Sequence, residues 1–95
     1  MYKIIRTKRS KANAIEIARY YEGCKDGLGE EFFQDYEKRI EKILKQTPKI
    51  AQIVYKNRRF LALKKFPHNI VFIINEPKKE VQVVAIIHPK RNIHP

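Results

Sequence analysis

The side chains of this sequence that could do chemistry are mostly basic, and they flank three short apolar runs in its second half. One group precedes the first run, a second lies at its far end, and a third follows the last run: Lys56, Arg58 and Arg59; Lys64, Lys65 and His68; His88, Lys90, Arg91 and His94. Histidine, with an ordinary pKa of about 6.5, can act as acid or base at neutral pH. Metal-independent cleavage of RNA needs such a group, together with cations that stabilise the charge of the transition state. The same residues also suit nucleic-acid binding without catalysis, or are solvated charges that prevent edge-to-edge pairing of sheets.

The apolar runs predict the strands that would position these residues. Phe60–Phe66, Ile70–Ile74 and Val81–Ile87 are rich in Val, Ile and Phe, and Pro and Asn residues bound them. This composition is typical of β-strands. The connections are too short for parallel crossovers, so we expect an antiparallel meander.

A meander of this kind brings some of the basic residues together. Its first and third strands run parallel, so the residues that follow each of them lie at the same end of the sheet. This predicts one neighbourhood for His88, Arg91 and either Lys64 or Lys65, with His68 as a further candidate. Side-chain alternation does not distinguish Lys64 from Lys65. The basic residues that precede the first strand are Lys56, Arg58 and Arg59. They should lie at the other end of the sheet, toward Lys79 and Glu80. Together with His68 and Lys90, they are candidates for binding a nucleic acid or another target.

Several other chemistries find no matching motif. The sequence has no glycine-rich phosphate loop, no Cys/His spacing typical of a metal site and no nucleophile elbow. The single cysteine, Cys24, cannot form an internal disulfide. We expect no metal and no cofactor.

The first half of the chain predicts one strand and two helices. Tyr2–Thr7 is a candidate strand, and Ser10 is a candidate N-cap for a helix that ends at Gly23. A second helix is expected from Leu28 to Thr47, with Pro48 after it. Together with the meander this predicts an α+β fold of two layers: an N-terminal strand, an antiparallel helical hairpin and a three-stranded antiparallel meander, in one domain that spans residues 1–95.

Charge is distributed unevenly along the chain. The net charge is +11, yet residues 10–47 carry seven basic and eight acidic residues, so the excess belongs to the strands, their loops and the termini. This favours an anionic partner, either nucleic acid or an acidic protein. No apolar run is long enough for a membrane span, and the first residues do not resemble a signal peptide, which favours the cytoplasm.

The meander is apolar on both faces. We expect Phe60, Phe72 and Val83 to face the helices. The other face would then present an apolar patch that fits a partner chain or a second copy of the protein: Leu61, Leu63, Val71, Ile73, Val84 and Ile86.

The order of elements resembles the RelE/ParE superfamily of bacterial toxins. The residues that carry the resemblance are spread over nearly the whole chain: Tyr21, Gly27-Leu28-Gly29 and Phe32 in the hairpin, Pro48 after it, Arg59 at the start of the meander, Phe66-Pro67-His68-Asn69-Ile70, and the closing Val84-Ala85-Ile86-Ile87-His88-Pro89-Lys90-Arg91-Asn92. The last segment is similar to the family's final strand followed by His-x-x-Arg.

The resemblance implies a toxin that an acidic antitoxin neutralises and leaves two targets open. ParE-like members act on DNA gyrase, whereas RelE-like members cut mRNA on the ribosome. Nucleases of the family often carry an arginine in the middle meander strand and an aromatic residue near the C-terminus; this chain has no arginine at His68–Val71 and no Tyr or Phe after Phe72. These departures favour a toxin that binds gyrase or another protein, while His88 and Arg91 keep the ribonuclease as an alternative. A nucleic-acid-binding module without toxicity is the third hypothesis.

Overall fold

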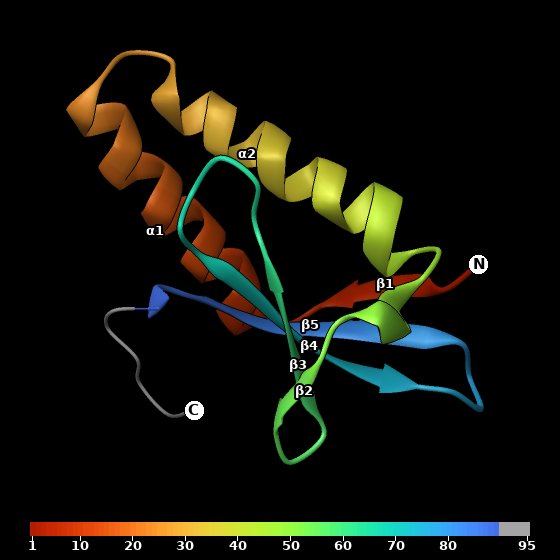
Figure 1. The fold of residues 1–95 in the computed structure, drawn as a ribbon. Helices are drawn as coiled ribbons and strands as arrows, with labels where there is room; N and C mark the ends of the chain where they lie inside the picture. Colours follow the sequence, from red (N-terminus) through yellow and green to blue (C-terminus); the bar gives the residue numbers. More distant parts are fainter. Residues whose placement is uncertain (90–95) are drawn as a thin grey trace.

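The computed structural model of the protein describes residues 1–89. In chain order the elements are β1 (Lys3–Arg6), α1 (Lys8–Cys24), α2 (Leu28–Arg39), the π-helical turn η1 (Ile40–Leu44), the 3₁₀ turn η2 (Pro48–Ile50), β2 (Ile53–Tyr55), β3 (Arg58–Ala62), β4 (Asn69–Asn75) and β5 (Glu80–Ile87). The two helices form a hairpin that covers one face of the sheet (Figure 1). The predicted α+β fold of two layers, with its order of elements, is confirmed.

The described residues form a five-stranded sheet with the strand order β1-β5-β4-β3-β2. Neighbours from β2 to β5 are antiparallel, which confirms the predicted meander, and β1 pairs with β5 in parallel. The sequence left the place of β1 open. This parallel pairing positions α1. Because α1 begins directly after β1, it lies along β5 beyond the end of β1.

The sequence did not predict β2. The segment from Pro48 to Arg59 contains η2 and a hairpin in which Lys56 turns the chain with a φ of 52°. All three residues of β2 are exposed. A short strand without a buried face leaves no alternation of apolar and polar residues in the sequence, so the pattern could not reveal it.

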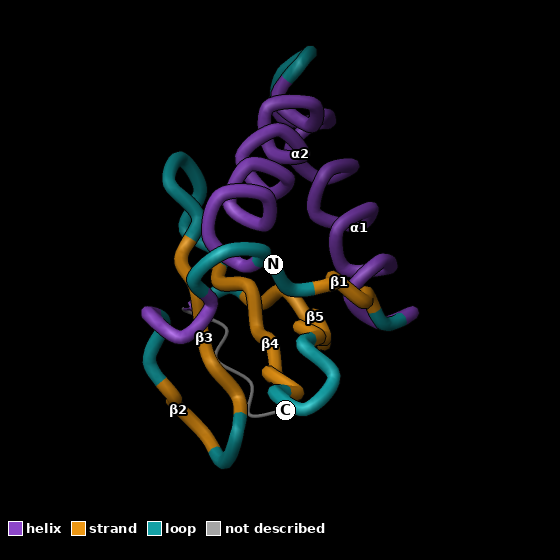
Figure 2. Tube along the Cα trace, turned by 90° about the vertical axis from the view of Figure 1, so that its right-hand side faces the viewer, coloured by secondary structure: helices purple, strands orange, loops and turns teal. Residues whose placement is uncertain are grey.

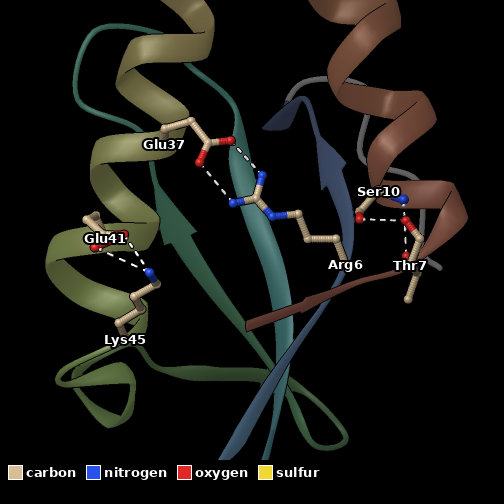
Figure 3. Close-up of polar contacts among 6 residues, drawn as sticks. All are labelled: Arg6, Thr7, Ser10, Glu37, Glu41 and Lys45. Carbon is tan, nitrogen blue, oxygen red and sulfur yellow. Dashed lines mark hydrogen bonds and ion pairs between the residues drawn. The ribbon is translucent and has the colours of Figure 1, made fainter. Parts of the chain in front are cut away.

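The helix boundaries differ from the predicted ones by a few residues. Thr7, and not Ser10, is the N-cap of α1: its side chain accepts a hydrogen bond from the backbone N–H of Ser10 at 3.1 Å, and the Ser10 hydroxyl donates to the Thr7 carbonyl at 2.8 Å (Figure 3). The helix continues through Gly23 to Cys24. The predicted second helix is α2 followed by η1, and Pro48 comes after it.

The turn between the helices is built around two glycines. Gly27 has a φ of 88°, a conformation that suits glycine. A Cβ on Gly29 would lie 2.7 Å from the carbonyl oxygen of Ala18, so glycine lets α1 and α2 pack closely there. The Glu22 carboxylate accepts hydrogen bonds from the N–H groups of both glycines, and these bonds lower the pKa of Glu22. This carboxylate therefore caps the start of α2, where Gly27 has no side chain to do so.

The core lies between the helices and one face of the sheet (Figure 2). Phe32, Tyr36, Ile40 and Leu44 from the second helical segment are at most 2% exposed. They pack against the sheet together with Ala14 and Ala18 of α1 and the strand residues Leu61, Leu63, Ile70, Phe72, Val81, Val83 and Ile86. Among residues 1–89 no helix is long and apolar enough to cross a membrane.

The register of β3 and β4 corrects the predicted facing of the meander. Phe60 lies opposite Val71, whereas Phe72 lies opposite Arg59. Directly opposed residues share a face, so Phe60 and Phe72 must point to opposite sides. Phe72 and Val83 face the helices as predicted, but the prediction for Phe60 was wrong.

Strand register also corrects three residues that were predicted to lie on the partner-binding face of the sheet. Leu61, Leu63 and Ile86 belong to the helix-side core and are at most 7% exposed. Leu61 lies opposite Ile70 and turns inward with it. Ile86 turns inward because an irregularity between β4 and β5 gives β5 one extra residue, which reverses the alternation there.

The remaining members of that predicted face lie outside the helix-side core: Val71, Ile73 and Val84. Val71 is nevertheless fully buried, and Ile73 and Val84 are half-buried. The second face of the sheet is therefore less open than the sequence predicted. The role of these three residues in binding a partner stays a prediction.

Candidate functional site

His68 and His88 come together at one end of the sheet, as predicted. His68 directly precedes β4 and His88 directly follows β5, and the pairing of Asn69 with Ile87 brings the two residues to the same place. Their ring centroids are 5.1 Å apart and the rings are perpendicular. We call this the histidine end of the sheet.

The two histidines have different surroundings. His68 is only 6% exposed, and its ring lies edge-on to Tyr21 and Phe32, each with a centroid distance of 5.9 Å. Phe66 completes this aromatic cluster through contacts with the same two rings. His88 is half-buried and lies nearer the surface. His68 is therefore part of the core, and of the two histidines His88 is the better placed for chemistry on a bound molecule.

A cavity of about 250 Å³ adjoins both histidines. Residues from α1 and from the ends of the strands line it: Arg9, Asn13, Glu16, Ile17, His68, Ile86, Ile87 and His88. It brings a histidine, an arginine and a carboxylate to one hollow, which is a combination that can move a proton and hold an anion. Within residues 1–89, no group of three His, Cys, Asp or Glu side chains could hold a metal ion.

Sequence reasoning missed the three polar residues that α1 contributes to this cavity. They are Arg9, Asn13 and Glu16, and their place depends on the parallel pairing of β1 with β5. Asn13 shows how closely α1 follows that edge: its Oδ1 accepts a hydrogen bond from the N–H of Ile86 at 3.0 Å, beyond the point where β1 ends. Their spacing in the sequence predicts that Arg9, Asn13 and Glu16 share one face of a helix. That this face lies beside His88 follows only from the pairing of β1 with β5.

Lys64 and Lys65 do not join the histidine cavity. Their backbone N–H groups donate to the two carboxylate oxygens of Asp35 in α2, at 3.2 and 2.7 Å. Both residues line a different hollow, beside α2. The predicted grouping of His88 with a lysine of this pair is therefore not supported. The predicted site residues Lys90 and Arg91, as well as His94, lie outside the described residues.

The basic residues that precede β3 lie toward the opposite end of the sheet. Arg59 shares a groove with Glu80, as the predicted meander requires. Its guanidinium donates from one Nη to the carbonyl oxygens of Ala51 at 2.7 Å and Lys49 at 3.1 Å, so it ties η2 to the sheet. Lys56 lies over the ring of Tyr55 at 5.4 Å, and Arg58 is half-buried. For Lys56 and Arg58 a role in target binding stays a prediction.

The groove at that end has a volume of about 620 Å³ and is lined by residues of β1, β3, β4 and β5. Its side chains from the strands include Ile5, Ile73 and Gln82. Glu76 lies on its rim and accepts a hydrogen bond from the Tyr2 hydroxyl at 2.6 Å, and it forms ion pairs with Lys49 and Lys79 at 2.9 and 3.3 Å. The Tyr2 hydrogen bond, followed by that of Lys49, lowers the pKa of Glu76 to about 2.

A bidentate ion pair connects the first strand to the second helix. Arg6 donates from its two Nη atoms to the Glu37 carboxylate at 2.6 and 2.9 Å (Figure 3), and its guanidinium lies 5.4 Å from the centre of the Tyr36 ring. These hydrogen bonds raise the pKa of Arg6 and lower that of Glu37. The pair therefore connects β1 to α2.

No protein-family model matches the chain, and no curated protein matches it in sequence. Two solved structures are similar to it in fold. A chain from the chromosomal ParDE toxin–antitoxin system of P. aeruginosa aligns with a TM-score of 0.73 and 20% identity, over 93% of this chain and 96% of that one. A chain from the intact E. coli RelBE toxin–antitoxin complex aligns over the same shares with a TM-score of 0.52 and 10% identity.

These similarities confirm the fold that the resemblance to the RelE/ParE superfamily implied. Each alignment covers nearly the whole of both chains, so the similarity extends to the order and connection of the elements and is not limited to one motif. At identities of 20% and 10% the likeness concerns the fold alone.

Proposed function

We propose that the protein is the toxin of a type II toxin–antitoxin pair, that it acts in the cytoplasm by binding gyrase or another protein, and that an acidic antitoxin neutralises it. The observation that carries this proposal is the alignment with a ParDE chain over 93% of the sequence. The net charge of +11 supports an acidic partner, because opposite charge accelerates encounter and stabilises the complex.

Action by binding, and not by RNA cleavage, is supported by how the basic residues are distributed. Acid–base catalysis needs the reacting groups within hydrogen-bond reach of one substrate. His88 lines the cavity beside α1, whereas Lys64 and Lys65 line the hollow beside α2. The two lysines that the sequence offered for a catalytic centre with His88 therefore lie away from it.

One observation favours the ribonuclease as a second candidate. The cavity at the histidine end holds His88, Arg9 and Glu16 on the same lining. In this alternative His88 would transfer a proton, Glu16 would be its acid–base counterpart and Arg9 would stabilise the negative charge on phosphate.

Expression without an antitoxin tests the proposal directly. We expect growth arrest after induction in bacteria, with DNA breaks and induction of the SOS response if gyrase is the target. Cleaved transcripts and stalled translation would instead support the ribonuclease. Accumulation of folded protein at a high level without any effect on growth would overturn both and leave the plain nucleic-acid-binding module.

His88→Ala separates the two modes of action. A ribonuclease that uses His88 should lose about 100-fold or more of its cleavage rate, which is the usual contribution of a positioned acid or base. A toxin that acts by binding elsewhere should keep its toxicity. Gln46→Ala, at an exposed residue near the start of β1 and away from His88, is the control, and circular dichroism should establish that both variants are folded.

A further inference from the structure

The hollow beside α2 that Lys64 and Lys65 line lies between this helix and the connection from β3 to β4, which rises from the sheet to α2 in Figures 1 and 2. Its volume is about 280 Å³. We call it the α2 groove, and its lining residues are Glu31, Gln34, Asp35, Lys38, Arg39, Lys42, Ile43, Lys64 and Lys65. Five of these nine residues are basic, although the helical half of the sequence carries no excess of positive charge.

Hydrogen bonds from two residues of α2 connect the two sides of the α2 groove. Asp35 is 7% exposed, and its carboxylate accepts the N–H groups of Lys64 and Lys65. Arg39 donates from Nε to the carbonyl oxygen of Ala62 at 3.0 Å. Both contacts run from α2 to the end of β3 and the residues after it, so they hold together the two backbone segments that carry the lysines.

The charge of the α2 groove is not compensated within the part of the chain that the structure describes. Lys38, Lys42 and the Lys64–Lys65 pair have exposed side chains, and none of them is in an ion pair of residues 1–89. Of the two acidic residues, Asp35 is already engaged by backbone N–H groups. An anionic ligand would find several cations and few competing carboxylates.

The base of the α2 groove is partly apolar. Ile43 lies in the lining and also packs against the hydrophobic core. The lysine side chains add their methylene stems, which can cover an apolar group while the ammonium groups remain in water. A ligand that fits this arrangement carries negative charges on both sides of an apolar group.

From this arrangement we infer that the α2 groove binds an acidic peptide segment that inserts one apolar side chain over Ile43 and places flanking carboxylates near the lysines. The inference rests on the proposed function, since the antitoxin of the pair would supply the segment. A nucleic-acid strand fits less well, because its charges repeat along the backbone and its bases need aromatic surfaces to stack on. The α2 groove has no aromatic residue in its lining.

Binding of defined probes tests the inference. The probes are a short fluorescein-labelled peptide of Asp, Glu and Ser with one central Leu, the same peptide with Ser in place of the Leu, and a single-stranded oligouridylate of equal length. We expect fluorescence anisotropy at low salt to show tighter binding of the Leu peptide than of the other two. The double variants Lys38→Gln/Lys42→Gln and Lys64→Gln/Lys65→Gln should each weaken that binding by about fivefold, the combined worth of two exposed charges.

The matched control is Lys11→Gln/Lys78→Gln, which removes the same charge at two exposed positions outside the α2 groove. We expect it to leave the affinity for the Leu peptide nearly unchanged. Equal losses in the control and the groove variants, equal affinity for the Ser peptide, or preference for the oligouridylate would each overturn the inference.

The growth experiment distinguishes a failure of the α2 groove inference from a failure of the toxin proposal. If the wild-type protein arrests growth but the peptide binds without regard to the groove lysines, the toxin proposal stands and the α2 groove is not the docking site. If the protein is harmless but the groove variants lose peptide binding, the groove is an acidic-peptide site and the toxin proposal is wrong.

Discussion

The two ends of the sheet are stabilised by different kinds of contact. At the histidine end, the contacts are buried or use the backbone: His68 lies in an aromatic cluster, and the Asp35 carboxylate holds the connection between β3 and β4. At the opposite end, which we call the Glu76 end, the half-buried Tyr2 hydroxyl and the exposed ammonium groups of Lys49 and Lys79 converge on one carboxylate. Burial strengthens hydrogen bonds and makes their loss costly, whereas exposed ion pairs contribute little and depend on salt.

This difference indicates where the fold can tolerate change. The histidine end joins α1, α2, β4 and β5, and both the cavity beside His88 and the α2 groove depend on that junction. The Glu76 end joins the start of β1 to the β4–β5 turn through contacts that water can replace. We therefore expect substitutions to have large effects on stability at the first end and effects governed by pH and salt at the second.

Asp35→Ala should have the largest effect. The substitution leaves two part-buried N–H groups without their acceptor. An unsatisfied group costs about 1–3 kcal/mol when it is buried, so for the two together we expect a loss of about 3 kcal/mol in the free energy of unfolding. Urea denaturation measures it. Asp26→Ala, at an exposed position in the turn between the helices, is the control and should cost less than about 0.5 kcal/mol. Equal stabilities of the two variants would show that the connection between β3 and β4 does not depend on this carboxylate.

The two histidines should differ in the same assay. His68→Ala removes a ring from a closed aromatic cluster, and we expect a cost of about 2 kcal/mol, somewhat less than for a larger buried aromatic residue. His88→Ala removes a half-buried ring and should cost less than about 1 kcal/mol. The reverse order would mean that His88, and not His68, holds this end together.

The sequence predicted the parts of this arrangement that local patterns determine. Strand composition and short connections predicted the meander, and the meander brought His68 and His88 together. Helical spacing and glycines predicted the hairpin. Each of these features depends on residues that are close in the sequence.

What could not be predicted depends on register and on placement between distant segments. One residue of register decides whether Phe60 or Leu61 faces the helices, and the pattern of the strand is apolar at both. Asp35 has no signature of its own, since a carboxylate in a helix is ordinarily exposed. Its contact with Lys64 and Lys65 crosses about thirty residues of sequence and removes both lysines from the predicted catalytic group. The parallel pairing of β1 with β5, on which Arg9 and Glu16 depend, is of the same kind.

The smallest and most condition-dependent effect is expected at Glu76. Its pKa in the folded protein is about 2, below the ordinary value of 4.5, because the Tyr2 hydroxyl and Lys49 stabilise the ionised form. In the unfolded chain the carboxyl takes up its proton first as the pH falls. The stabilisation from Glu76 is therefore complete above about pH 5, decreases as the pH falls through 4.5, and is lost near pH 2.

Glu76→Gln should remove this pH dependence. The difference in unfolding free energy between wild type and variant should be largest near neutral pH, shrink on acidification toward pH 2, and be reduced by molar salt because the charges are exposed. Tyr2→Phe removes the strongest contributor and so raises the pKa of Glu76 in the folded protein; the loss on acidification should then be smaller, and complete at a higher pH, than in the wild type. Thermal denaturation over a series of acidic buffers measures both. If wild type and Glu76→Gln differ by the same amount at every pH and salt concentration, the Glu76 end owes its stability to packing, and the contrast between the two ends is wrong.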